Sequence, residues 1–131
     1  MSKKKKKQEA HIAGILRTRD GILLVRKKKA DHVYWSLPMG KIELHETPQI
    51  ALKRIFWAET GLLVDLGHIS NTMHSDVVSG KQQTTHRLSS AFFVKKVGGE
   101  LREGVVKFMK PRNLHDIRLN ERSRLFLASA R

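Results

Sequence analysis

The chain has 131 residues, 40% of them apolar, which is enough to bury one hydrophobic core in one domain. It contains no cysteine, which excludes disulfides and cysteine-based zinc sites and fits a reducing compartment such as the cytoplasm. No apolar run approaches the roughly 18 residues that a membrane-spanning helix needs, and the N-terminal apolar stretch is too short for a secretory signal. We therefore expect a cytoplasmic protein that does not contact a membrane.

Positive charge dominates the composition. Lysine and arginine number 26 against 12 acidic residues, a formal net charge of +14. The run Lys3–Lys7 is typical either of a disordered tail or of a phosphate-binding arm, and in a eukaryote it could direct the protein to the nucleus. The other 21 basic residues still outnumber the acids by nine, so we expect an anionic partner such as a nucleotide, RNA or DNA. The predicted boundaries are a flexible basic tail over 1–9 and one domain over 10–131.

The predicted elements are strands and two helices in an irregular order. Asp20-Gly21 is typical of a tight hairpin turn, because glycine tolerates positive φ. Thr47-Pro48 and Gly61 fit the two ends of a helix. This irregular order favours a mixed α/β sandwich over a regular parallel repeat. We expect strands over 11–18, 22–28, 62–74, 86–97 and 105–110, helices over 48–60 and 121–130 (the second capped by Asn120, with Leu125 and Phe126 inward), loops over 28–35, 40–46 and 98–104, and a polar turn over 75–83.

The stretch from Gly40 to Leu62 carries residues at the spacings of a known motif. It resembles the Nudix box: G, five residues, E, seven residues, then R-E-U-x-E-E-x-G-U, where U is apolar. The preceding WSLPMG is similar to the W-x-L-P-G-G that commonly precedes the box, and Glu43 fits its usual loop acid. The resemblance extends over about residues 10–130 and implies an α/β fold of the α+β type, a Nudix-like α/β/α sandwich with a mixed sheet. The matching positions are Gly40, Glu46, Arg54, Phe56, Glu59, Gly61 and Leu62.

The resemblance implies Mg²⁺-dependent cleavage of a diphosphate linked to another moiety, usually within a nucleotide. Water must attack a phosphorus surrounded by negative oxygens, so divalent cations must neutralise the phosphates and lower the pKa of the water. Mg²⁺ prefers hard oxygen ligands and is held poorly by one carboxylate. Helix positions three and four apart share a face, so acids at positions 55, 58 and 59 would converge on one metal cluster. The family's box has glutamate at all three.

This chain keeps only one of those three carboxylates, Glu59. Ile55 stands where a glutamate of the motif would help to activate water, and Ala58 replaces a metal ligand. Neither side chain can bind Mg²⁺ or accept a proton, and the face that they occupy could have become part of the core. Met39 stands where glycine is usual, at a position whose backbone carbonyl can ligate metal in the family; losing glycine's freedom could alter the loop.

Ligands from outside the box could compensate for this loss. The resemblance implies a further acid from a late loop, for which Glu103 is the first candidate and Glu100 the second; ordinary loop solvation is the alternative. Glu46 is implied to support the box loop or to reach the metal, or it could contact the positive end of the helix. Glu46, Glu59, Glu103 and the carbonyl of Met39 would then hold one Mg²⁺ or Mn²⁺.

Arg54 is expected to orient Glu43 or Glu46 through an ion pair, or to contact a substrate phosphate. With Glu59 and Glu46 it completes the candidate catalytic residues. Trp35 could stack a nucleobase or pack the fold. The candidate ligand-binding residues are Gly40, Lys41, Glu43, Arg54 and Trp35.

Two more groups in this region are candidates for contacts with phosphate. His45 replaces the glycine usual before Glu46, and it is either a stand-in base or phosphate donor or a solvated loop histidine. The lysines at 27–29 and 41 could hold a polyphosphate or an RNA backbone by charge.

We predict a Nudix-fold protein that binds a nucleoside diphosphate-type or other phosphate-rich ligand, with Mg²⁺-dependent diphosphate hydrolysis weak or lost. General-base help alone is worth about 10²–10⁴-fold, so losing the box acids should be costly. One alternative is an active hydrolase of a nucleoside diphosphate linked to another moiety, with ligands supplied from outside the box. Another is a non-catalytic RNA-binding or ribonucleoprotein component that uses the basic body and Lys3–Lys7. The oligomeric state stays open.

Overall fold

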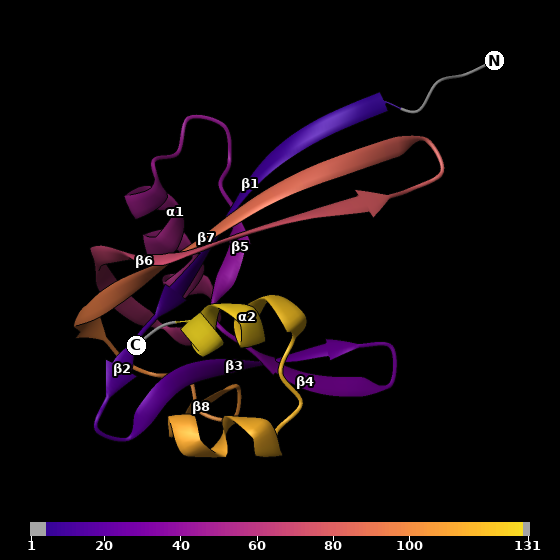
Figure 1. The fold of residues 1–131 in the computed structure, drawn as a ribbon. Helices are drawn as coiled ribbons and strands as arrows, with labels where there is room; N and C mark the ends of the chain where they lie inside the picture. The colour runs from indigo at the N-terminus through magenta and orange to yellow at the C-terminus, as the bar shows by residue number, and fades with distance from the viewer. Residues whose placement is uncertain (1–4, 130–131) are drawn as a thin grey trace.

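The structure is a computed structural model and describes residues 5–129 (Figure 1). The helices are α1 (Pro48–Thr60), the short 3₁₀ helix η1 (Pro111–Asp116) and α2 (Glu121–Ser129). The strands are β1 (Lys5–Ile15), β2 (Arg17–Thr18), β3 (Gly21–Lys29), β4 (His32–Ser36), β5 (Met39–Lys41), β6 (Leu62–Ser79), β7 (Gln83–Gly99) and β8 (Val106–Met109).

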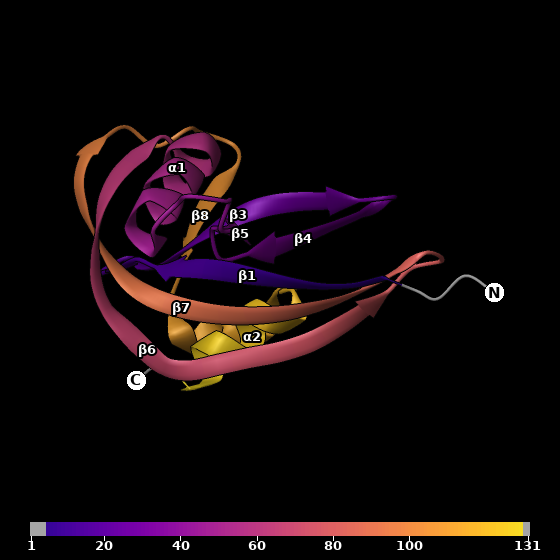
Figure 2. The ribbon, with the colours of Figure 1, turned by 90° about the horizontal axis from the view of Figure 1, so that it is seen from above.

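Two four-stranded sheets form the middle layer. The first has the order β5-β1-β7-β6, in which β1 and β7 run parallel and the other pairs run antiparallel. In the second, β3 pairs antiparallel with β2, β4 and β8. Figure 2 shows α1 and α2 on opposite sides of the strands. The predicted α/β/α sandwich with a mixed sheet is therefore confirmed.

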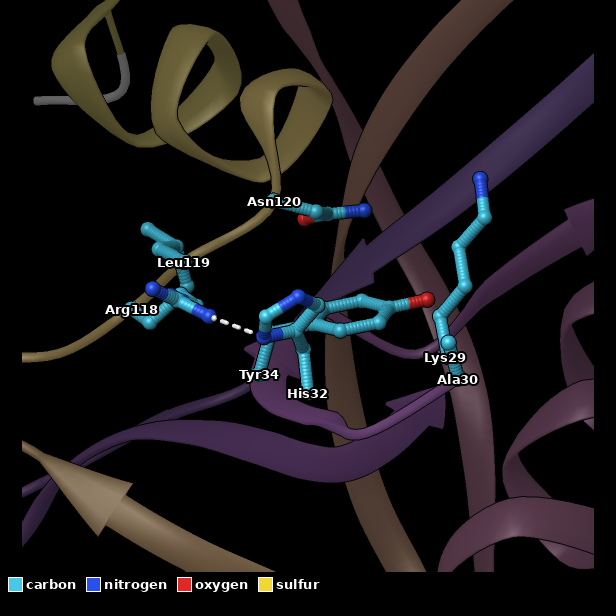
Figure 3. A pocket seen from close by; sticks show the side chains of 7 residues that line it. All are labelled: Lys29, Ala30, His32, Tyr34, Arg118, Leu119 and Asn120. Atoms are coloured by element: carbon cyan, nitrogen blue, oxygen red, sulfur yellow. Dashed lines mark hydrogen bonds between the residues drawn. The ribbon is translucent and has the colours of Figure 1, made fainter.

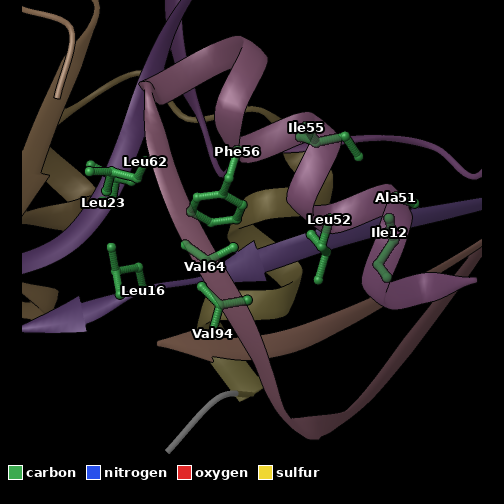
Figure 4. Packing of buried hydrophobic residues seen from close by; sticks show 10 residues of the cluster. All are labelled: Ile12, Leu16, Leu23, Ala51, Leu52, Ile55, Phe56, Leu62, Val64 and Val94. Atoms are coloured by element: carbon green, nitrogen blue, oxygen red, sulfur yellow. The ribbon is translucent and has the colours of Figure 1, made fainter. Parts of the chain in front are cut away.

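Both α-helices bury an apolar face against the strands. On the α1 side, Leu52 and Phe56 point toward residues of β1, β3, β6 and β7, and Ile55 belongs to the same buried cluster (Figure 4). Phe56 is fully buried, and a Cβ at Gly14 of β1 would overlap its ring. On the α2 side, Phe126 is fully buried in a second cluster. The first cluster fixes α1, which carries the box, to the sheets, and the second does the same for α2.

The ends of α1 agree with the sequence prediction. Thr47 Oγ1 accepts a hydrogen bond from the backbone N–H of Ile50 at 3.2 Å, so it caps the first turn. At the other end Gly61 has φ of +81° and donates its N–H to the carbonyls of Phe56 and Trp57. None of the helices within residues 5–129 is long and apolar enough to span a membrane.

The boundary of the basic tail differs from the prediction. Strand β1 begins at Lys5 and pairs in regular parallel register with β7, starting at Gln83. Residues 5–9 therefore belong to the sheet, because backbone pairing does not depend on the lysine side chains. The first four residues of the predicted tail lie outside the described part of the chain.

Three further predictions were wrong in detail. The loop expected over 28–35 is a hairpin of β3 and β4, since Lys29 pairs with His32 across a two-residue turn. The polar turn expected over 75–83 shrinks to three residues, because the β-branched and serine-rich segments on either side pair with each other. In α2, Phe126 is buried as expected, but Leu125 is 38% exposed.

Candidate functional site

The loop of the box is held to α1 by Arg54 and Glu46. Arg54 donates from Nε and Nη2 to the two carboxylate oxygens of Glu46 at 2.7 and 2.8 Å. Nη2 also donates to the carbonyl of Lys41 at 2.8 Å, and Glu46 accepts the backbone N–H of Glu43 at 2.7 Å. The Arg54 bond and then the Glu43 N–H lower the pKa of Glu46 to about 2. Arg54 therefore orients Glu46, the pairing that the sequence analysis expected.

His45 lies in this loop with an unusual backbone conformation. Its φ is +70° and its side chain is exposed. A residue with a Cβ is strained in this left-handed region, and glycine is not. His45 stands where the motif usually has glycine, and its backbone adopts the conformation that favours glycine.

We expect His45→Gly to raise the free energy of unfolding by about 0.5 kcal/mol, because relief of backbone strain exceeds the entropy that glycine adds to the unfolded chain. Urea denaturation would measure the change. Leu44→Gly is the matched control: Leu44 is 85% exposed, has no positive φ, and should lose about 0.5–1 kcal/mol as glycine. Equal losses for both variants would contradict the assignment of strain to His45.

Glu59 lies in the last turn of α1 and is largely buried, with a side chain 19% exposed. Lys27 Nζ of β3 lies 2.6 Å from its Oε2. This oxygen is buried, and no donor in residues 5–129 approaches it with hydrogen-bond geometry, so the contact with Lys27 is an attraction of charges. Burial raises the pKa of Glu59, and Lys27 and the donated backbone N–H of Met39 oppose that rise.

The other two positions of the metal-binding face have diverged in opposite ways. Ile55 is 3% exposed and belongs to the α1-side core, where its Cδ1 would lie 3.2 Å from a Cβ placed on Gly40. Ala58 is exposed to solvent. The face where three carboxylates would converge has therefore become core at one position and bare surface at another.

The loop between β7 and β8 turns an arginine, not an acid, toward α1. Arg102 donates its backbone N–H to Thr60 O at 3.0 Å, and its guanidinium donates to Ala58 O at 2.6 Å and Trp57 O at 3.1 Å. A cation at the C-terminal carbonyls of a helix is stabilising. Glu100 and Glu103 of this loop are both exposed.

The side chains at the box do not fit a divalent cation. Within residues 5–129, no three histidine, aspartate or glutamate side chains come close enough to hold a metal ion. The structure thus does not bring Glu46, Glu59 and Glu103 together: Glu46 is bound by Arg54, Glu59 faces Lys27, and the loop of Glu103 is held by its arginine. The backbone N–H of Met39 lowers the pKa of Glu59, and the metal-binding role of the Met39 carbonyl stays a prediction.

A pocket of about 490 Å³ opens where the β3–β4 hairpin approaches the start of α2 (Figure 3). Arg118 Nη1 lies 3.2 Å from His32 Nδ1, and the ring of Tyr34 lies beside this pair. We call this cavity the Tyr34 pocket. It is lined by Lys29, Ala30, His32, Tyr34, Arg118, Leu119 and Asn120.

The Tyr34 pocket adjoins the box through two contacts. Tyr34 is the direct cross-strand partner of Lys27, the residue that faces Glu59. Asn120 Nδ2 lies 3.6 Å from the sulfur of Met39, whose N–H binds Glu59. These two contacts join the pocket lining to the residues that meet Glu59 in the last turn of α1.

Trp35 does not line this pocket. Lys107 Nζ lies 4.7 Å from the centre of its ring, and the ring packs on the α2-side core. Neighbouring residues of a strand point to opposite faces, so Tyr34 faces the pocket and Trp35 does not. Of the two predicted roles of Trp35, packing is the one that these contacts support. Because the sequence analysis expected a loop over 28–35, it did not predict this alternation. A predicted hairpin would have placed His32 and Tyr34 on one face.

The sequence and the fold both match known proteins. The sequence model of the NUDIX domain matches residues 6–129. A MutT-like protein of Streptomyces ambofaciens is 39% identical over 59 residues, which are 45% of this chain and only 38% of the relative.

Solved structures share the fold at low identity. A MutT NUDIX hydrolase of Burkholderia pseudomallei superposes with a TM-score of 0.71 at 18% identity, covering 94% of this chain and 98% of the other. An ADP-ribose pyrophosphatase of Streptococcus suis gives a TM-score of 0.68 at 17% identity, covering 92% and 87%. With a domain match over nearly the whole chain and this shared fold, the chain belongs to the NUDIX family.

Proposed function

We propose that this protein binds a nucleoside diphosphate-type or similar phosphate-rich ligand in the Tyr34 pocket, and that its Mg²⁺-dependent diphosphate hydrolysis is weak or lost. The observation that carries the proposal is the pocket itself, which Lys29, His32 and Arg118 line together with the aromatic ring of Tyr34.

The chemistry of the lining fits an anionic ligand with a planar group. The guanidinium of Arg118 matches phosphate oxygens as a fork of two donors, and Lys29 adds a point charge. The ring of Tyr34 offers a surface on which a base can stack, a contact worth about 1–3 kcal/mol in single-stranded nucleic-acid sites. The +14 net charge would attract such a ligand over longer distances. The likeness to an ADP-ribose pyrophosphatase supports a ligand that contains a diphosphate.

The state of the box supports weak or absent hydrolysis. Nudix hydrolases generally depend on divalent metal ions. Here one carboxylate, Glu59, stands where the motif has three, and Lys27 neutralises it. Two other residues of the box, Arg54 and Glu46, bind each other and hold the loop. Arg54 and Glu46 thus hold the shape of the site and do not provide a metal cluster for hydrolysis.

We expect Arg118→Ala to weaken binding of ADP-ribose or ADP about tenfold, which corresponds to about 1.4 kcal/mol, because a charge-assisted phosphate contact is lost. Isothermal titration calorimetry at low salt would measure it. Arg124→Ala is the matched control, since Arg124 is an exposed arginine of α2 outside the pocket lining. It removes the same charge and should weaken binding less than about twofold.

Turnover of the same ligands with Mg²⁺ should not exceed that of a Glu59→Gln variant. Turnover well above that variant would overturn the loss of hydrolysis and leave the binding site standing. Absence of binding to every nucleotide tested at low salt would overturn the binding proposal. Tight binding of single-stranded RNA without binding of any mononucleotide would favour the RNA-binding alternative instead.

A further inference from the structure

We infer that Lys27 is the resident cation of the box: its ammonium supplies to Glu59 the positive charge that a divalent metal would otherwise supply. The protein therefore takes its phosphate-rich ligand in the metal-free form. The second statement rests on the proposed function, and the first does not.

The position of Lys27 follows from the alternation of β3. Leu23 points into the α1-side core, and Lys27, four residues further along the strand, points to the same side. There its ammonium meets the buried oxygen of Glu59 at 2.6 Å. The side chains are 33% and 19% exposed, so the pair is partly shielded from water and interacts more strongly than a surface pair.

A divalent cation cannot easily replace this ammonium. Mg²⁺ requires several hard oxygen ligands, and the metal-binding face of α1 offers the carboxylate of Glu59, the methyl group of Ala58 and the buried Ile55. Displacing Lys27 would also leave the metal as the sole partner of Oε2, because no other donor in the described chain reaches that oxygen. The lysine is tethered beside Glu59 by its own strand, whereas a metal must be drawn from solution.

This arrangement changes which form of the ligand fits. The Tyr34 pocket presents the cations Lys29 and Arg118, and these would contact phosphate oxygens directly. Mg²⁺ in solution coordinates the same oxygens of di- and triphosphates. Mg²⁺ should therefore compete with the protein for the ligand, the reverse of its role in a metal-dependent hydrolase.

The first test uses Mn²⁺ alone and needs no ligand. Electron paramagnetic resonance would measure Mn²⁺ binding to the full chain and to Lys27→Met/Ala58→Glu, which removes the ammonium and adds one carboxylate at an exposed position. We expect this variant to bind Mn²⁺ at least tenfold more tightly than the wild type. Lys27→Arg/Ala58→Glu is the matched control: it has the same new carboxylate but keeps a cation, and should resemble the wild type. One-to-one binding to the wild type as tight as to the first variant would overturn the inference.

A second measurement needs no variant of Lys27, so it tests the inference even if the lysine variant does not fold. Limited acetylation of the wild-type protein, followed by mass spectrometry, would compare Lys27 with its neighbour Lys28. We expect Lys27 to react at least tenfold more slowly because it is bound to Glu59. Equal rates would show that the ammonium is free, and they would contradict the inference.

The third test concerns the ligand. ATP binding would be titrated in EDTA and in excess Mg²⁺ at matched ionic strength. We expect the affinity to fall several-fold with Mg²⁺; an increase that Glu59→Gln abolishes would refute the metal-free form. If ATP and the other nucleotides do not bind at all, the proposed function fails, while the Mn²⁺ and acetylation results still decide the role of Lys27.

Discussion

Replacing Ile55 by glutamate should lower the free energy of unfolding by at least about 3 kcal/mol, because a carboxylate would be buried without a partner. The isoleucine is 3% exposed and packs within the α1-side core against Gly40. Ala58→Glu should change the same free energy by no more than about 0.5 kcal/mol, since its side chain points to solvent. Both substitutions restore the residue of the Nudix motif at their position, and only burial distinguishes them.

Urea denaturation followed by circular dichroism would measure both variants, and Ile55→Met separates burial of charge from change of shape. Methionine is apolar and of similar volume, so it should cost less than about 1.5 kcal/mol. A glutamate at Ile55 that is tolerated as well as methionine would show that this face of α1 can open to solvent. Then the restored motif could regain metal-dependent turnover, which we do not expect from the packing in Figure 4.

The parts of the molecule that the sequence predicts well depend on local chemistry. The ends of α1 follow from Thr47, Pro48 and Gly61, which act through bonds within one turn. The pairing of Arg54 with Glu46 likewise joins residues eight apart, within the span of the motif. Fixed spacing along one helix and its loop is information that a single sequence contains.

The contacts that decide the chemistry are not local. Arg118 and His32 meet in the Tyr34 pocket although they lie 86 residues apart in the chain. Lys27 reaches Glu59 only because β3 runs under α1, and a run of lysines gives no sign of which one turns inward. The sequence showed which carboxylates the box lacks, whereas the residue that balances the remaining one becomes visible only in the fold.

Several box residues that match the motif stabilise the fold. This explains how the rest of the motif can be present although two of its acids are missing. Arg54 and Glu46 fix the loop, and Phe56 fills the core beneath Gly14. Gly61 ends the helix and lies against the backbone of Glu100, where an added Cβ would overlap the carbonyl oxygen. Loss of any of these would damage the fold, whereas the exposed position 58 bears only on the chemistry.

Gly61→Ala should accordingly cost about 3 kcal/mol, the sum of a left-handed backbone that alanine tolerates poorly and an overlap with backbone that cannot move aside. Gly104→Ala is the matched control. Gly104 has nearly the same φ, +83° against +81°, but nothing lies within 4 Å of its added Cβ. It should lose only about 1–2 kcal/mol, so the difference between the two variants isolates the overlap.

Thermal unfolding would show the same ranking, with each kcal/mol lowering Tm by about 3–6 °C in a chain of this size. Equal losses for both variants would mean that the end of α1 can shift away from Glu100. Such a shift would also move Glu59, two residues before Gly61, relative to Lys27. In that case acetylation of Lys27 in folded Gly61→Ala protein would speed up, while in Gly104→Ala it would stay at the wild-type rate. The glycine of the motif would then be tied to the ion pair, because it holds the helix end where the lysine can reach its carboxylate.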